Sequence, residues 1–167
     1  MVNWHVAYTK PRTEKKVFQS LLDRGYECYC PLSRTKRKWS DRVKWVEEPV
    51  FRSYIFVRID RKDMGVALQV PGLIKFIFQE GQPAVVRDKE IELIKKFLRD
   101  HVNVSARPTT NAVRALKPGQ TVRISSGMLM GQKASVFQVR NKEVRVVIKS
   151  LGQELVATVD PDVLKSE

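Results

Sequence analysis

The hydrophobic pattern of this chain stops between residues 101 and 115, and this interruption most constrains what the chain can fold into. Before it, apolar residues follow both strand-like and helix-like spacings, and after it only short β-branched runs return. Asn, Ser, Thr, Pro and Ala dominate the interruption, a composition typical of a linker. We therefore predict two folded domains, residues 1–100 and 116–167, joined by a linker over residues 101–115.

The first part mixes strand and helix signals. Val17, Phe18, Leu21 and Leu22 lie on one face of a 3.6-residue period, which predicts a helix over residues 13–24 that Gly25 ends. Further helices are expected after Asp60, to about residue 69, and from a cap at Asp88. Strands are expected at residues 4–8, 26–32, 50–59 and 73–78, with a hairpin tip at residues 40–41. This order predicts an α+β fold, an antiparallel sheet flanked by helices.

The second part contains only strand signals. Four β-branched runs, separated by Gly- and Asn-containing turns, occupy residues 121–124, 133–139, 143–149 and 153–159. Short strands at this spacing predict a small β-barrel.

The charge of the chain favours an anionic partner. Lys and Arg number 31 against 18 acidic residues, a formal net charge of +13, which suits a nucleic acid, an acidic protein face or a membrane surface. The densest basic run has only Asp41 in opposition and contains Trp39 and Trp45. Its cations are Arg34, Lys36, Arg37, Lys38, Arg42 and Lys44. We predict that this run binds nucleic acid, the alternative being a solvated hairpin whose charge only aids solubility.

Several functional classes are disfavoured. The chain has two histidines, His5 and His101, and its two cysteines, Cys28 and Cys30, are too close together for a relaxed disulfide or a zinc spacing. The glycines of residues 127–131 lack the Lys and Ser/Thr of a phosphate-binding loop. We predict a protein that is not an enzyme and has no cofactor or metal. An apolar run of membrane-spanning length and an export signal are also absent from the sequence, so we expect a reduced, cytoplasmic protein with no membrane contact.

Five segments in order resemble the NusG-type transcription elongation factors. They are Trp4–Tyr8, Phe51–Val57, Val70–Leu73, Pro83 with Asp88–Ile91, and Pro118–Ile124 followed by Gly127–Gly131. The last resembles a KOW motif. The resemblance implies an NGN-like N-terminal domain and a KOW, SH3-like C-terminal barrel. Arg52 and Ser53 replace the Pro and the Gly or Asn usual in the family. With the high basicity, this favours a specialised paralogue of the RfaH or capsule-operon regulator (UpxY-like) kind.

The resemblance also implies partners for the first domain. In the family this domain docks an apolar pocket onto RNA polymerase and suppresses pausing. The implied pocket residues are Tyr8, Phe51, Tyr54 and Phe56. Unless a bulge intervenes, alternation places Tyr54 and Phe56 on one sheet face and Phe51 on the other, so that one of these sets is core instead. Nucleic-acid candidates, for non-template DNA or nascent RNA, are the basic run and a cluster at the first helix start. That cluster is Lys10, Arg12, Lys15 and Lys16.

For the second domain the resemblance implies recruitment of Rho or of the ribosomal protein NusE. The candidate face comprises Gly127, Met128, Leu129, Met130, Gly131 and Phe137, with Phe137 alternatively a core residue. The β-branched composition favours strands over a helical, autoinhibitory form of this domain. We therefore predict a monomeric transcription elongation and antitermination regulator. The alternative is a ribosome-associated KOW-type RNA-binding protein.

Overall fold

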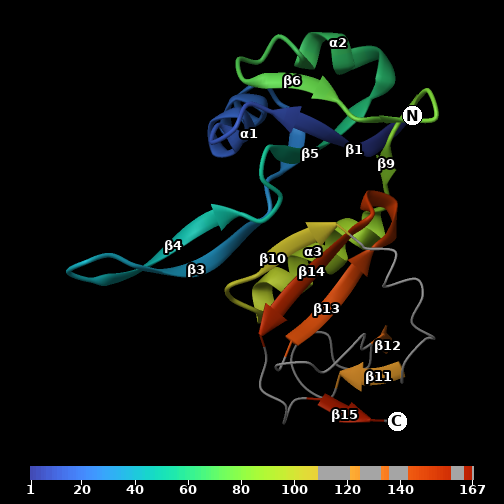
Figure 1. Cartoon of the computed structure of the whole chain (residues 1–167). Helices are drawn as coiled ribbons and strands as arrows, with labels where there is room; N and C mark the ends of the chain where they lie inside the picture. The colour runs from blue at the N-terminus through green and yellow to red at the C-terminus, as the bar shows by residue number, and fades with distance from the viewer. Residues whose placement is uncertain (109–120, 125–132, 136–142, 159–163, 167) are drawn as a thin grey trace. The chain divides into compact units, whose positions relative to one another are not determined.

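The computed structural model describes residues 1–108, 121–124, 133–135, 143–158 and 164–166 (Figure 1). The chain divides into two units. One comprises residues 1–32 and 49–92, and the other residues 33–48 and 93–167. The basic run of residues 34–44 therefore groups with the later part of the chain and not with the strands that flank it in sequence.

An antiparallel sheet forms the centre of the first unit, as predicted. Its order is β2 (Glu27–Tyr29), β5 (Tyr54–Asp60), β1 (Val2–Thr9) and β6 (Leu73–Phe76), and β9 (Val85–Val86) pairs with the same side of β1 near its start. Strand β1 pairs with β5 along seven residue pairs, from Val2 opposite Asp60 to Tyr8 opposite Tyr54. The aromatic first strand is thus central to the sheet.

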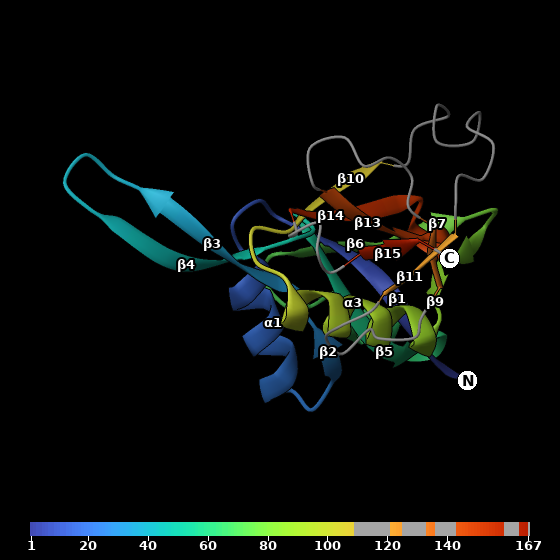
Figure 2. The same cartoon turned by 90° about the horizontal axis from the view of Figure 1, so that it is seen from below.

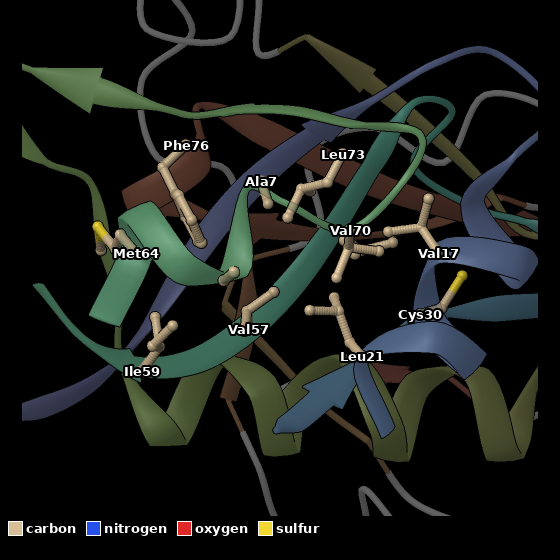
Figure 3. Close-up of a cluster of buried hydrophobic side chains, with 12 residues drawn as sticks. Ala7, Val17, Leu21, Cys30, Val57, Ile59, Met64, Val70, Leu73 and Phe76 are labelled. Carbon is tan, nitrogen blue, oxygen red and sulfur yellow. The ribbon is translucent and has the colours of Figure 1, made fainter. Parts of the chain in front are cut away.

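One sheet face is buried beneath two helices, α1 (Glu14–Asp23) and α2 (Met64–Ala67). Val17 and Leu21 of α1 pack with Ile55 and Val57 of β5 in one apolar cluster (Figure 3). This confirms the predicted helix and the burial of Val17 and Leu21, whereas Leu22, predicted on the same face, is 40% exposed. The predicted cap at Asp60 is confirmed too, because its side chain accepts a hydrogen bond from the Lys62 N–H at the start of the short helix η1 (Arg61–Asp63).

The starts of β5 and α3 differ from prediction for identifiable reasons. Strand β5 begins at Tyr54 and not at residue 50, because Ser53 adopts a left-handed φ of 65° and the Tyr54 N–H bonds to the Phe51 carbonyl. Helix α3 (Asp88–Asp100) is not capped by Asp88, which is its first residue. Instead the Glu90 carboxylate accepts from the Arg87 N–H at 3.1 Å. A small hairpin, β7 (Phe78–Gln79) and β8 (Gln82–Pro83), precedes β9.

A long hairpin opens the second unit. Strands β3 (Leu32–Lys38) and β4 (Val43–Pro49) run side by side and form a two-stranded sheet of their own (Figure 1, Figure 2). The Trp39 N–H donates to the Arg42 carbonyl at 2.8 Å, which closes the turn at residues 40–41. The predicted tip is confirmed.

The remaining strands form two three-stranded antiparallel sheets. One has the order β10 (Ser105–Pro108), β14 (Gln153–Thr158), β13 (Glu143–Ile148); the other has the order β12 (Lys133–Ser135), β11 (Thr121–Ile124), β15 (Leu164–Ser166). A short helix η2 (Lys149–Leu151) joins β13 to β14. Strands therefore occur in all four predicted runs, while closure into a barrel stays a prediction.

Strand β10 lies inside the predicted linker and corrects that prediction over residues 105–108. Ser105 to Pro108 pair with Val156 to Gln153 of β14. The sequence of β10 has no apolar alternation, so periodicity does not detect it. Its strand conformation is fixed by backbone hydrogen bonds to β14, which follows almost fifty residues later. The other predicted linker residues, 109–115, lie outside the described part of the chain.

Candidate functional site

The four aromatic residues predicted to form a pocket meet at one end of the sheet. Tyr8 and Tyr54 lie opposite each other on β1 and β5, with ring centroids 5.5 Å apart. Phe51 packs edge-on against Phe56 at 5.6 Å. Tyr29 of β2 stacks on the same Phe56 ring at 6.2 Å. The cluster therefore contains the predicted residues and Tyr29, which the sequence analysis missed.

Burial divides this aromatic cluster into a floor and an accessible edge. Phe56 is 1% exposed and Phe51 6% exposed, whereas Tyr54 is 37% exposed and Tyr8 is half-buried. Rings as deeply buried as those of Phe51 and Phe56 stabilise the fold and are not accessible to a partner. Tyr29 is half-buried, as Tyr8 is. The three tyrosines are therefore the members of the cluster that a partner protein can touch, and Tyr54 is the most exposed of them.

The side chain of Phe51 lies on the same side as Phe56, which corrects the alternation argument. Alternation holds only within a strand, and residue 51 precedes β5. The intervening turn is held by Glu14 of α1, a buried carboxylate whose Oε1 accepts from the Ser53 N–H at 2.8 Å. The Thr9 N–H donates to the Ser53 carbonyl, also at 2.8 Å. The Arg52-Ser53 departure from the family pattern thus falls at the turn that aims Tyr54.

A cation borders the accessible edge. The Lys75 ammonium nitrogen lies 6.0 Å from the Tyr8 ring centroid, since Lys75 on β6 is the cross-strand partner of Tyr8. This is within the range of a cation–π contact. The sequence contains no signal for it, because only the pairing of β1 with β6 brings the two residues together.

The predicted nucleic-acid-binding cations of residues 34–44 all lie on the β3–β4 hairpin and are exposed. One of them is neutralised within the protein. Arg37 donates two hydrogen bonds to Glu48 of the other strand, from Nε at 2.9 Å and from Nη2 at 2.7 Å. Bidentate pairing of this kind ties up the guanidinium fork. Arg37 therefore serves the hairpin itself more than a ligand.

Two other arginines stack on the tryptophans of the hairpin. The guanidinium carbon of Arg42 lies 5.3 Å from the Trp39 ring centroid, and that of Arg34 lies 5.6 Å from the Trp45 centroid. Both distances fit cation–π contacts. The first pair spans the turn, and the second joins β3 to β4.

Asn103 anchors the base of the hairpin. Its backbone N–H donates to the Arg34 carbonyl at 2.9 Å, and its side-chain oxygen accepts from the Lys36 N–H at 3.1 Å. Next to it, the Val104 N–H donates to the Ser33 hydroxyl at 2.9 Å. Asn103 has a φ of 53°, which Asn tolerates better than most residues. Sequence reasoning placed this segment in a linker and missed it as a positioning element.

The remaining predicted residues are placed as follows. Lys10, Arg12, Lys15 and Lys16 are exposed around the start of α1. The predicted face of the second domain, residues 127–131 and Phe137, lies outside the described residues.

The histidines and cysteines have structural surroundings. His5 is buried and its Nδ1 lies 2.9 Å from the Ala84 carbonyl oxygen. His101 packs against Phe97, and its burial lowers its pKa. Both cysteines are free thiols. Within the described residues, no three His, Cys, Asp or Glu side chains group in a way that could hold a metal ion.

Both thiols should resist alkylation at neutral pH. Burial, with the neighbouring Cys30, raises the pKa of Cys28 to about 12, and burial with Glu14 raises that of Cys30 to about 11. Since only the thiolate is nucleophilic, reaction with iodoacetamide at pH 8 should be roughly a hundredfold slower in native than in urea-unfolded protein. The native rate should still rise with pH above 10. Equal rates in the two states would contradict this assignment.

Comparison with known proteins identifies the family. A family model described as transcription termination factor nusG matches residues 2–95, more than half of the chain. The chain belongs to the NusG family. Transcription termination/antitermination proteins NusG of Streptococcus pyogenes serotypes M3 and M1 are each 26% identical to it, over 94% of this chain and 92% of theirs.

A solved structure supports the same assignment at the level of fold. The structure titled "Domain interaction in Thermotoga maritima NusG" matches with a TM-score of 0.55 and 19% identity, covering 99% of this chain and 97% of that one. NusG-family proteins are transcription factors and not enzymes. Of the predicted elongation and antitermination regulator, the comparisons confirm a NusG-like transcription termination/antitermination factor that is not an enzyme. Among the described residues, no helix is long and apolar enough to cross a membrane.

Proposed function

We propose that this NusG-family protein binds RNA polymerase through the edge of its aromatic cluster and acts as an elongation and antitermination regulator. The carrying observation is the Tyr8–Tyr54 pair, an accessible edge beside the buried rings of Phe51 and Phe56 in the domain that the family model matches. Proteins of this family interact with RNA polymerase. A specialised paralogue of the RfaH or capsule-operon (UpxY-like) kind is favoured by the Arg52-Ser53 sequence at the turn before Tyr54 and by the net charge of +13.

The geometry suits a helical partner. An amphipathic helix that lies across Tyr8 and Tyr54 can bury apolar side chains between their rings, next to Phe56 on the same sheet face. Lys75 beside Tyr8 favours an acidic residue on that helix. Rigid rings on a preformed floor lose little conformational entropy on binding, which is why such residues dominate interface energies.

The two basic regions complement this role. We propose that the hairpin cations and the group at the start of α1 contact non-template DNA or nascent RNA while the protein is on polymerase. Exposure of both groups supports the proposal. For the KOW-like second domain we propose recruitment of Rho or of the ribosomal protein NusE, with the protein acting as a monomer in the cytoplasm.

The test of polymerase binding is a double substitution, Tyr8→Ala with Tyr54→Ala. Affinity for purified polymerase should fall by about 2 kcal/mol or more, roughly thirtyfold, because two of the three accessible rings of the cluster are lost. Phe56→Ala is unsuitable for this purpose, since Phe56 is buried and its loss destabilises the fold. The measurement is a binding titration with nuclease-treated polymerase.

Phe78→Ala is the matched control. Phe78 is an exposed aromatic residue of β7, outside the aromatic cluster, so its loss should leave the affinity unchanged. If the double variant binds as tightly as the natural protein, the interface assignment is wrong. Sedimentation with ribosomes in the absence of transcription, combined with no polymerase binding, would instead favour a ribosome-associated RNA-binding protein.

A further inference from the structure

The β3–β4 hairpin presents two tryptophans to solvent in an unusual setting. Trp39 is 46% exposed and Trp45 is 44% exposed, although indole rings are normally mostly buried. Each carries an arginine at cation–π distance, Arg42 on Trp39 and Arg34 on Trp45. Neither tryptophan belongs to the buried core of the described residues, so both are available to contact a ligand.

The two stacked arginines hold the indole rings of Trp39 and Trp45 in position for a planar ligand. A guanidinium held against an indole restricts the rotamers of both side chains before any ligand arrives, which lowers the entropic cost of binding. Each tryptophan residue keeps somewhat less than half of its surface exposed with its arginine in place. A planar ring placed on it would extend a stack that already contains guanidinium and indole.

The charges around the tryptophans favour an anionic ligand. Lys36, Lys38 and Lys44 are exposed on the same hairpin. Arg37 is held by Glu48, and two arginines lie against the tryptophans, so the three lysines are the hairpin cations best placed to meet an anionic ligand. A ligand that is both planar and repeatedly anionic is a nucleic acid with accessible bases.

We propose that this hairpin binds single-stranded nucleic acid, with bases stacked on Trp39 and Trp45 and phosphates paired with Lys36, Lys38 and Lys44. The inference rests on the proposed nucleic-acid role of the hairpin and specifies its ligand. A duplex is disfavoured, because both faces of its internal bases are already covered by neighbouring base pairs. DNA and RNA strands share the required chemistry, since every base has a π-face.

The natural fluorescence of the protein provides the assay. The chain has three tryptophans, and the third, Trp4, is only 5% exposed. Titration of the full-length protein with oligothymidylate should quench emission from the two hairpin residues, and oligouridylate should do so as well. The same length of blunt duplex should bind at least about tenfold more weakly at equal salt.

Paired variants separate stacking from charge. Trp39→Ala and Trp45→Ala, followed by fluorescence anisotropy of labelled oligothymidylate, should each weaken binding about tenfold, whereas Trp→Phe at both positions should retain most of the affinity. The slope of log K against log salt should stay unchanged in these variants. Lys36→Ala with Lys38→Ala should instead lower that slope by about 1.4, because two phosphate contacts are lost.

Polymerase binding provides the independent check. Affinity of the tryptophan variants for nuclease-treated polymerase should equal that of the natural protein, so failure of this inference is distinguishable from failure of the proposed function. Absence of quenching, equal affinity for duplex and single strand, or full affinity in the double Trp→Ala variant would each overturn the inference.

Discussion

Replacing Phe56 by Ala should lower the free energy of unfolding by about 3–5 kcal/mol, the range for a buried aromatic residue truncated to Ala. Phe56 is 1% exposed and contacts both Phe51 and Tyr29 through its ring. Its removal leaves a cavity between two side chains that are themselves held by the sheet and by the turn before β5. Urea unfolding followed by circular dichroism measures the loss.

Tyr54→Ala is the control for Phe56→Ala, because it truncates an accessible ring of the same cluster. Tyr54 is two residues away on the same strand and the same sheet face, but it is 37% exposed. Its truncation should cost much less, about 1 kcal/mol, and should mainly weaken polymerase binding. If the two substitutions cost the same, the division of the cluster into a buried floor and an accessible edge is wrong.

Gly72→Ala should lower the free energy of unfolding by about 2–5 kcal/mol. Gly72 has a φ of 92°, and a Cβ there would lie 2.9 Å from the Val17 Cγ2 and 3.2 Å from the Thr13 Oγ1. The left-handed backbone costs a non-glycine residue about 1–2 kcal/mol, and forcing α1 away adds about 1–3 kcal/mol. Thermal and urea unfolding measure the effect.

Two other glycines separate these contributions. Gly25 has a φ of 83° but open space around its Cβ position, so Gly25→Ala should show the backbone cost alone, about 1–2 kcal/mol. Gly65 lies in α2, lacks a positive φ and also has open space, so Gly65→Ala should be neutral or stabilising by up to about 1 kcal/mol. Equal losses for Gly72 and Gly25 would show that the close approach to Val17 is relieved at no cost.

Local patterns predicted those elements whose signals lie within a few residues. The spacing of Val17 and Leu21 predicted α1 and the burial of these two residues. Apolar residues on the buried face of a helix recur every three to four positions, which is visible in the sequence. The Ser40-Asp41 tip was predicted from turn chemistry alone. The order of motifs pointed to the NusG family, which the comparison with known proteins then confirmed.

Predictions failed where a distant residue decides a local conformation. The side of Phe51 was wrong because Glu14, thirty-nine positions away from Ser53, holds the turn before β5. Strand β10 was taken for linker because its order depends on β14. The alignment of Lys75 with Tyr8 and the anchoring of the hairpin by Asn103 have the same character, since each depends on long-range pairing.

The sequence by itself determined the α+β class of the first part, the strands of the second, the basic aromatic hairpin and the family, because each is written in spacing, composition or motif order. Only the tertiary structure decided which aromatic rings are buried and which are accessible. It also decided which hairpin arginine forms an ion pair with Glu48 and which arginines lie over the tryptophans. Exposure and pairing are properties of side chains brought together across strands, and a linear pattern does not contain the register that brings them together.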